Sequence, residues 1–189
     1  ADISEAIKLR PDQADLYAKR GMGYRDASEL DKSLADYDKA IALDPKNAEW
    51  YAERATTYSW RSELDKAITD LNKAIELDPK FLNAYLQRGS DHRWMEQYEL
   101  ALADFMKARE LDPNSFASYR GTVDVYLAVL DQYKSLANYD LDAALADANK
   151  AVELSLSSDG TTYTDAGALY DRGRIHNHRN ETADAISDF

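Results

Sequence analysis

The four prolines of this chain are spaced 34 residues apart, and this spacing constrains the fold more than any other feature of the sequence. They are Pro11, Pro45, Pro79 and Pro113. The segments between successive prolines align on one another without gaps. Periods of about 20–50 residues are typical of arrays in which each unit packs on its neighbours. The sequence therefore predicts a stacked repeat protein, whose core lies between neighbouring units and has no single centre.

Side chains of the same kind recur at fixed places within each period. Two columns are aromatic, one is arginine and one is small: Tyr17, Tyr51, Tyr85 and Tyr119; Tyr24, Tyr58, His92 and Tyr126; Arg20, Arg54 and Arg88; Gly21, Ala55 and Gly89. Glycine inside a helix costs about 1 kcal/mol relative to alanine, so its recurrence indicates close packing between helices. We expect this small column to face Ser33, Ala67 and Ala101 on a second helix.

Each of the first three repeats closes on Leu-Asp-Pro. Together with the columns, this pattern resembles the tetratricopeptide repeat (TPR), a 34-residue helix–turn–helix with small residues at fixed places and a closing proline. The resemblance covers nearly the whole chain. It implies an all-α fold in which TPR helix-turn-helix repeats stack into a right-handed superhelical solenoid. It also implies a protein-binding scaffold with no chemistry of its own.

We expect residues 1–189 to form a single solenoid domain. The expected parts are a partial repeat with only its second helix at 1–13, full repeats at 14–47, 48–81 and 82–115, a repeat with an insertion of about nine residues at 116–158, and a loop with a truncated repeat at 159–189. Both ends fall inside a repeat, so we expect the chain to be a piece of a longer array.

In the first full repeat, the pattern predicts helices over about 14–27 and 31–43, with Asp12 placed to cap the first. Asp44 and Pro45 end the second helix, because the residue before a proline is biased out of the helical region and proline cannot continue the helix.

The fourth repeat departs from the period in two ways. Thr122 stands in the arginine column, and the segment 150–154 arrives nine residues late. We expect the first helix of this repeat to continue through the extra residues, which would add about 13 Å at 1.5 Å per residue. Asp140 should then cap a helix that begins at about Leu141. A second insertion at 155–165 is rich in Ser, Thr, Gly and Asp and predicts a surface loop, either simply tolerated or part of a binding face.

An aspartate column on the second helices matches the arginine column on the first helices: Asp36, Asp70, Asp104, Asp147 and Asp188. A planar guanidinium suits a carboxylate, so the columns predict Arg–Asp pairs within each repeat. The alternative is an arginine row that binds a ligand.

In the TPR family, the concave groove is lined mostly by the first helix of each repeat. The positions between the packing columns imply these groove residues: Met22, Arg25, Thr56, Ser59, Trp60, Ser90, Arg93, Trp94, Arg120 and Asp124. Trp60 and Trp94 lie one period apart, and tryptophan and arginine are enriched at binding hot spots. The alternative is that both indole rings pack against the next helix.

Some TPR domains grip a C-terminal carboxylate with lysine, arginine and asparagine side chains. The matching positions here hold Ala18, Met22, Glu53, Asn83 and Gln87. The basic side chains are missing and Glu53 would repel a carboxylate, so we do not expect this function.

Composition disfavours several other classes of function. The net charge is −12, half of it from residues 116–189, and no Lys/Arg cluster is present, so we expect no nucleic-acid binding. The acidity either keeps the chain soluble or attracts a basic partner. No apolar run is long enough for a membrane span. Cysteine is absent, which excludes thiolate metal sites, and the histidines lack zinc-ligand spacing.

We therefore predict a scaffold that binds a peptide or partner protein in its concave groove, with no catalytic residue, cofactor or metal. The alternatives are a regulatory or targeting module of a larger enzyme or signalling protein, and a structural array that self-associates through its exposed ends. The sequence leaves the compartment and the identity of the partner open.

Overall fold

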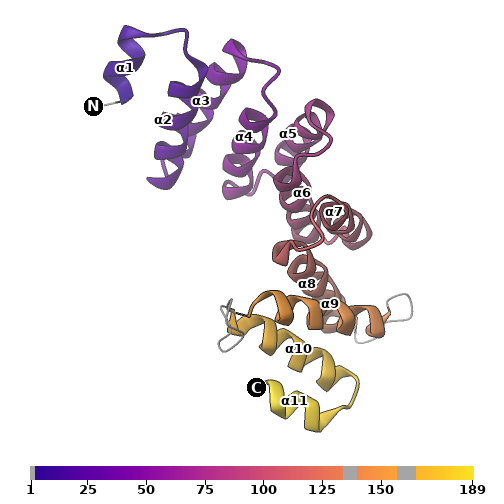
Figure 1. The fold of residues 1–189 in the computed structure, drawn as a ribbon. Helices are drawn as coiled ribbons and strands as arrows, with labels where there is room; N and C mark the ends of the chain where they lie inside the picture. Colours follow the sequence, from indigo (N-terminus) through magenta and orange to yellow (C-terminus); the bar gives the residue numbers. More distant parts are fainter. Residues whose placement is uncertain (1–2, 134–139, 157–164) are drawn as a thin grey trace. The chain divides into compact units, whose positions relative to one another are not determined.

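The computed structural model describes residues 3–133, 140–156 and 165–189, and the fold is all-α as predicted (Figure 1). Eleven helices lie within the described residues: α1 (Ile3–Leu9), α2 (Ala14–Asp26), α3 (Leu30–Leu43), α4 (Ala48–Trp60), α5 (Leu64–Leu77), α6 (Leu82–Trp94), α7 (Tyr98–Leu111), α8 (Phe116–Tyr133), α9 (Leu141–Leu154), α10 (Ala166–His178) and α11 (Thr182–Asp188).

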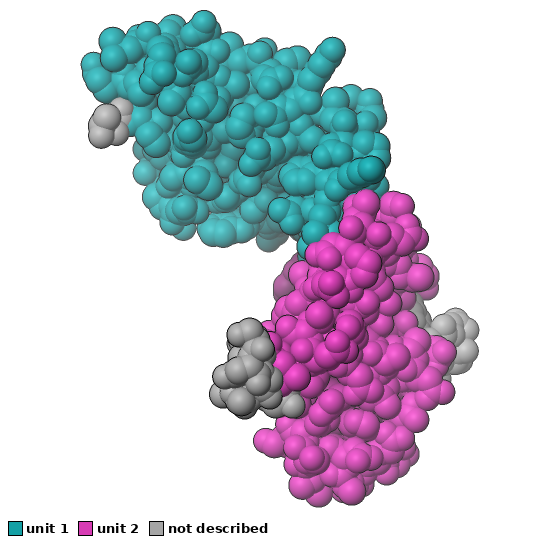
Figure 2. Space-filling model, in the orientation of Figure 1, with its two compact units in different colours: residues 1–91 teal, residues 92–189 magenta. Residues whose placement is uncertain are grey.

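The chain divides into two compact units, which Figure 2 shows in different colours. Unit 1 comprises Ala1–Asp91 and unit 2 comprises His92–Phe189, so the boundary falls within α6. Each unit is built from helical hairpins. In unit 1, α2 packs on α3 and α4 packs on α5; in unit 2, α8 packs on α9 and α10 packs on α11.

The small-residue column lets the two helices of a hairpin approach closely. A Cβ at Gly21 of α2 would lie 3.3 Å from the backbone oxygen of Ser33 and 3.2 Å from Cε2 of Tyr37, both on α3. These contacts are tight even for a methyl group, and they agree with the predicted facing of the small columns. In the next repeat, Ala55 and Ala67 are fully buried.

The proline and tyrosine columns are joined by a recurring hydrogen bond. The hydroxyl of Tyr17 donates to the carbonyl of Pro11, and the later repeats form the same bond between Tyr51 and Pro45, Tyr85 and Pro79, and Tyr119 and Pro113, at 3.0–3.3 Å. Each tyrosine thus fixes the turn that precedes its own helix. This contact explains why the two columns repeat together.

The turn inside four of the hairpins also recurs, those of α2–α3, α4–α5, α6–α7 and α10–α11. Ser28, Ser62, Glu96 and Asn180 have φ between 59° and 61°, in the left-handed region that side chains other than glycine rarely adopt. The next residue donates its N–H back to the carbonyl five residues before it, as Glu29 does to Tyr24 at 2.8 Å. This bond satisfies a carbonyl at the end of the first helix.

The predicted Arg–Asp pairs form within the repeats. Arg20 donates to both oxygens of Asp36 at 2.7 Å, Arg54 does the same to Asp70 at 2.7 Å, and Arg172 pairs with Asp188 through two hydrogen bonds. Arg88 and Asp104 lie in different units, so their pairing stays a prediction.

In the fourth repeat, different side chains donate hydrogen bonds to the aspartate of the second helix. Asp147 of α9 accepts hydrogen bonds from the hydroxyl of Thr122, at 2.7 Å, and from Nη2 of Arg109, at 2.7 Å. Arg109 belongs to α7 of the preceding repeat, and its guanidinium lies 4.3 Å from the centre of the Tyr119 ring. A cation from a neighbouring repeat has replaced the missing arginine.

Two boundary predictions have opposite outcomes. The predicted cap Asp12 was wrong by one residue: Gln13 precedes α2 and its side chain makes no capping bond, whereas the equivalent Asn47 accepts from the N–H of Glu49 at 3.0 Å. Asp140 does cap α9, accepting from the N–H groups of Asp142 and Ala143.

The two insertions are described only in part. α8 has 18 residues against 13 for α2, α4, α6 and α10, so the predicted continuation of this helix is confirmed as far as Tyr133. The remaining part of that insertion, 134–139, and most of the second insertion, 157–164, lie outside the described residues.

Candidate functional site

The ten predicted groove residues all lie on first helices of hairpins and divide between the two units. Six belong to unit 1: Met22 and Arg25 on α2, Thr56, Ser59 and Trp60 on α4, and Ser90 on α6. The other four belong to unit 2: Arg93 and Trp94 on α6, and Arg120 and Asp124 on α8.

In unit 1, several of these side chains link one first helix to the next. Arg25, only 8% exposed, donates to Oε2 of Glu53 at 2.7 Å. Thr56 Oγ1 lies 3.1 Å from Oε1 of Gln87. These polar contacts hold neighbouring repeats together and leave less of each side chain available to a ligand.

Ser59 completes the series by donating to Oδ2 of Asp91 at 2.9 Å. Asp91 is 3% exposed, and burial raises the pKa of its carboxyl to about 6, an effect that the Ser59 hydrogen bond opposes. A buried carboxylate with only a hydroxyl donor is a costly arrangement.

A pocket of about 290 Å³ opens between α2, α3 and α4, and Met22, 45% exposed, is one of its walls. The lining residues are Asp15, Ala18, Lys19, Met22, Tyr37, Glu49, Trp50 and Glu53. Tyr37 is fully buried, and its hydroxyl donates to Oε2 of Glu53 at 3.2 Å, the same oxygen that accepts from Arg25. Burial raises the pKa of Tyr37, with the charge of Glu53 acting in the same direction.

Sequence reasoning placed Met22 in the groove but missed Glu49 and Trp50, which lie on the first turn of α4. The column of Trp50 holds Leu16, Ala84 and Ser118 in the other repeats. A tryptophan in a column that elsewhere holds smaller side chains was the signal that could have identified this wall.

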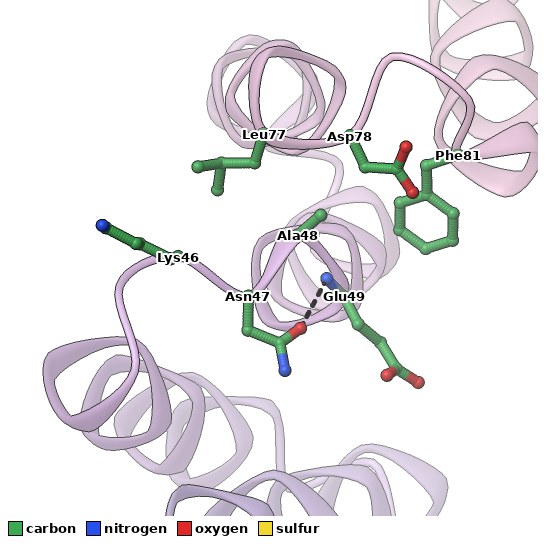
Figure 3. A pocket seen from close by; sticks show the side chains of 7 residues that line it. All are labelled: Lys46, Asn47, Ala48, Glu49, Leu77, Asp78 and Phe81. Atoms are coloured by element: carbon green, nitrogen blue, oxygen red, sulfur yellow. Dashed lines mark hydrogen bonds between the residues drawn. The ribbon is translucent and has the colours of Figure 1, made fainter.

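A wider pocket of about 520 Å³ lies at the turns before α4 and α6 (Figure 3). Lys46, Asn47, Ala48, Glu49, Leu77, Asp78 and Phe81 line it. Its Asn47 and Asp78 oxygens already accept from the backbone N–H groups of Glu49 and Lys80. Those two side chains therefore serve to shape the turns, and Glu49 borders both pockets.

The two predicted tryptophans expose most of their rings. Trp60 is 56% exposed, with the Arg25 guanidinium 6.0 Å from its ring centre, and Trp94 is 70% exposed, with the Arg93 guanidinium at 5.1 Å. In each unit an arginine and a tryptophan from adjacent predicted columns therefore lie together. Such cation–π contacts contribute about 0.5–1 kcal/mol at exposed sites.

In unit 2, Arg120 and Asp124 belong to an ionic network between α8 and α10. Arg120 donates to Oδ2 of Asp165 at 2.7 Å, and its Nε lies 3.0 Å from Oδ2 of Asp171 and 3.9 Å from Oδ1 of Asp124. Burial raises the pKa of both Asp124 and Asp171, although nearby arginines oppose this shift. The network ties the fourth repeat to the fifth.

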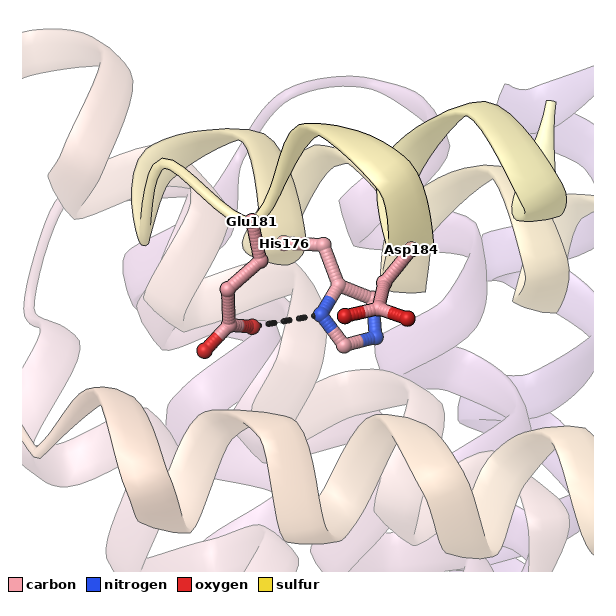
Figure 4. A group of neighbouring side chains, drawn as sticks. All are labelled: His176, Glu181 and Asp184. Atoms are coloured by element: carbon pink, nitrogen blue, oxygen red, sulfur yellow. Dashed lines mark hydrogen bonds and ion pairs between the residues drawn. The ribbon is translucent and has the colours of Figure 1, made fainter.

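One group of side chains in the described residues has ligand atoms close enough for a metal ion: His176, Glu181 and Asp184, all within 4.8 Å of one another (Figure 4). Nδ1 of His176 lies 2.7 Å from Oε2 of Glu181, and Arg179 also donates to Glu181. The same contact recurs as His92 Nδ1 with the amide oxygen of Gln97 at 2.7 Å. Because an amide replaces the carboxylate there, we interpret the contact as part of the repeated turn.

Within the parts of the chain that the structure describes, no helix has the length and apolar character required to cross a membrane.

Comparison with known proteins agrees with this architecture. The tetratricopeptide repeat model matches residues 14–47 and 49–81. YrrB, described as a TPR protein with an unusual peptide-binding site, is 22% identical, with a TM-score of 0.70 and coverage of 100% of this chain and 89% of its own. MamA from Desulfovibrio magneticus RS-1 is 16% identical, with a TM-score of 0.75 and coverage of 93% and 90%.

A third structure is the first TPR of Spaghetti (RPAP3), bound to the HSP90 peptide SRMEEVD. It is 26% identical, with a TM-score of 0.59 and coverage of 62% of this chain and 93% of its own. No curated protein sequence matches the chain. The helical hairpins, their recurring contacts and these likenesses define a helical repeat protein. Residues 14–81 contain two tetratricopeptide repeats, and the chain as a whole has the fold of TPR structures.

Proposed function

We propose that this chain is a non-catalytic scaffold whose first helices bind a peptide or an extended segment of a partner protein. One observation carries the proposal: α2, α4 and α6 each expose one large apolar side chain in the C-terminal half of the helix, Met22, Trp60 and Trp94. Tryptophans are frequent anchors in protein interfaces.

Two further features support this function. The pocket between α2 and α4 lies beside Met22 and offers a concave surface next to exposed apolar atoms. The Spaghetti (RPAP3) domain, 26% identical to this chain, holds a peptide. The other predicted groove residues lie on the same set of first helices in our proposal, among them Ser90 and Arg93 on α6 and Asp124 on α8.

The test is a peptide-array screen with the wild type and the Trp60→Ala/Trp94→Ala double variant. We expect the double variant to remain helical and to bind the recovered peptides at least about tenfold more weakly. A matched control is Leu100→Ala/Met106→Ala, which removes two exposed apolar side chains from a second helix, α7. Equal binding by the wild type and the tryptophan double variant would contradict the proposal.

Self-association is a second candidate, because Tyr170, Ile186 and Phe189 expose apolar surface on the last hairpin and its C-terminal residue, with the Tyr170 and Phe189 rings 5.6 Å apart. Sedimentation velocity over a range of protein concentrations tests it. A mass that rises with concentration and falls back to the monomer in Ile186→Glu supports this reading, and a constant monomer mass contradicts it.

A further inference from the structure

The charge of the pocket between α2 and α4 leads to a more specific inference, which rests on the proposed function. Three carboxylates line the pocket, those of Asp15, Glu49 and Glu53, against one ammonium group, that of Lys19. Nζ of Lys19 lies 3.5 Å from Oδ2 of Asp15, and Arg25 forms an ion pair with Glu53. Even with Arg25 counted, the carboxylates outnumber the cations by three to two.

Glu49 supplies the uncompensated charge. Its backbone N–H caps α4 by donating to Asn47, but its exposed carboxylate forms no ion pair with any of the described residues. Because Glu49 lines both of the pockets described above, a cation bound in either one would lie near its side chain.

One carboxylate oxygen of Glu53 can still accept a hydrogen bond. Arg25 and Tyr37 both donate to Oε2, whereas Oε1 accepts no hydrogen bond from the residues that the structure describes. An ionised carboxylate can accept about four hydrogen bonds, so this group can take a further donor without losing the contacts that hold it.

The pocket walls suit the stem of a long cationic side chain. Met22 and Ala18 of α2 and Trp50 of α4 contribute apolar atoms to its lining. Lysine and arginine bury their methylene stems against apolar surface while the charged head stays near water or a carboxylate. The ring of Trp50 also offers a surface over which a guanidinium or ammonium group is attracted.

We propose that this pocket selects a basic side chain, and that the partner segment carries a lysine or arginine beside an apolar residue. The same positions in this chain, Ala18, Met22 and Glu53, lack the basic groups that hold an acidic peptide end in some relatives. An acidic segment such as SRMEEVD, bound by the Spaghetti (RPAP3) domain, would bring carboxylates towards Glu49 and Glu53. The net charge of −12 also steers a basic segment to the surface, an effect that salt weakens.

The experiment measures binding of four fluorescein-labelled decapeptide pools by fluorescence anisotropy. The central residue is fixed as arginine, lysine, leucine or glutamate, and the flanking positions are randomised identically. We expect the wild type to bind the arginine and lysine pools at least about tenfold more tightly than the glutamate pool at low salt, and the difference should shrink as salt is added.

Two charge-reversal variants separate the pocket from the overall charge. Glu49→Lys should abolish the preference for the basic pools, whereas Asp65→Lys should keep it. Asp65 is a close match: it is exposed, lies in the first turn of its helix as Glu49 does, but belongs to the second helix α5. Equal effects of both variants, or tighter binding of the glutamate pool by the wild type, would overturn the inference.

The outcomes also distinguish this inference from the proposed function. If all four pools bind equally and Trp60→Ala weakens them all, the groove binds peptides and the basic preference is refuted. If no pool binds the wild type, both proposals are refuted.

Discussion

Asp70 in unit 1 and Asp147 in unit 2 occupy the same position of their repeats, yet different side chains donate hydrogen bonds to them. Asp70 is held by Arg54 of its own repeat, through two hydrogen bonds of 2.7 Å. Asp147 is held by Thr122 and by Arg109 of the preceding repeat, also at 2.7 Å each. Both aspartates are at least nine-tenths buried. The scaffold therefore requires a donor to a buried carboxylate and not a particular arginine.

A third buried aspartate sharpens this comparison. Asp91 lies on a first helix and accepts a hydrogen bond from Ser59, but no cation is among the groups that shift its pKa. Unit 1 thus accommodates a buried carboxyl group in two ways: Asp70 forms a strong ion pair, whereas the pKa of Asp91 is raised. Of the four predictions that follow, three test these differences and the last compares a left-handed turn in each unit; they run from the largest expected effect to the smallest.

Replacing Arg54 by methionine should cost the most stability. It leaves Asp70 buried without its two charge-assisted hydrogen bonds, and removal of one partner of such a pair typically costs about 3–5 kcal/mol. Urea denaturation followed by circular dichroism measures the loss. The double variant Arg54→Met/Asp70→Leu should recover much of it, and a double variant as unstable as the single one would contradict the ion-pair explanation.

Arg109→Met should cost less, about 2–3 kcal/mol, because Thr122 still donates to Asp147. The same denaturation experiment gives the number. If Arg109→Met were harmless, Thr122 alone would suffice for Asp147, and the proposed replacement of one arginine by another would be wrong.

Asp91→Asn should stabilise the protein at neutral pH. The pKa of Asp91 is raised to about 6 in the folded chain, above its ordinary unfolded value of 3.8. The folded state therefore holds the proton more tightly, so this carboxyl favours folding at low pH and loses that contribution as pH rises from about 4 to about 6. The expected gain of Asp91→Asn at pH 7 is about 2 kcal/mol.

The control for this third prediction is the pH dependence itself. The stability of the wild type should fall relative to that of Asp91→Asn between about pH 4 and pH 6, and parallel stability curves for the two proteins would show that Asp91 is not responsible.

The smallest effect concerns the left-handed turns. Ser28→Gly should stabilise unit 1 by up to about 1 kcal/mol, because glycine adopts a φ of 60° without the Cβ penalty. Glu96→Gly should gain less, since Oε2 of Glu96 accepts from Gln132 at 3.0 Å in unit 2. Thermal melts of both variants compare the two turns, and a larger gain at Glu96 would contradict this reading.

Much of the fold could be predicted because the period repeats local contacts. The tyrosine, proline, arginine and aspartate columns correspond to hydrogen bonds in the structure, such as those of Tyr17 with Pro11 and Arg20 with Asp36. The cap of α2 could not be placed to one residue, because Asp12 is of the preferred capping type but Gln13 stands at the position before the helix, and sequence patterns locate helix ends only to within one or two residues.

The replacement of one arginine by another at Asp147 left two traces in the sequence, and the pattern gave no reason to connect them. Thr122 breaks the arginine column, and Arg109 stands where Ile41 and Ile75 occur in earlier repeats. Only the structure shows that the second departure compensates for the first. The pocket charge was missed for a similar reason: Glu49 and Trp50 lie on a helix turn that the groove positions did not include.

The three tryptophans of the chain provide the most direct test of the central claim that the first helices form the binding surface. Trp50 and Trp60 lie on α4 and Trp94 lies on α6, so the three indole N–H signals in a ¹⁵N–¹H correlation spectrum report on that surface alone. On titration with the tightest-binding decapeptide from the arginine pool, we predict that the Trp50 and Trp60 signals shift with the binding curve. Saturation of the peptide with all three indole signals unmoved, and shifts confined to α3, α5 or α7, would contradict the account.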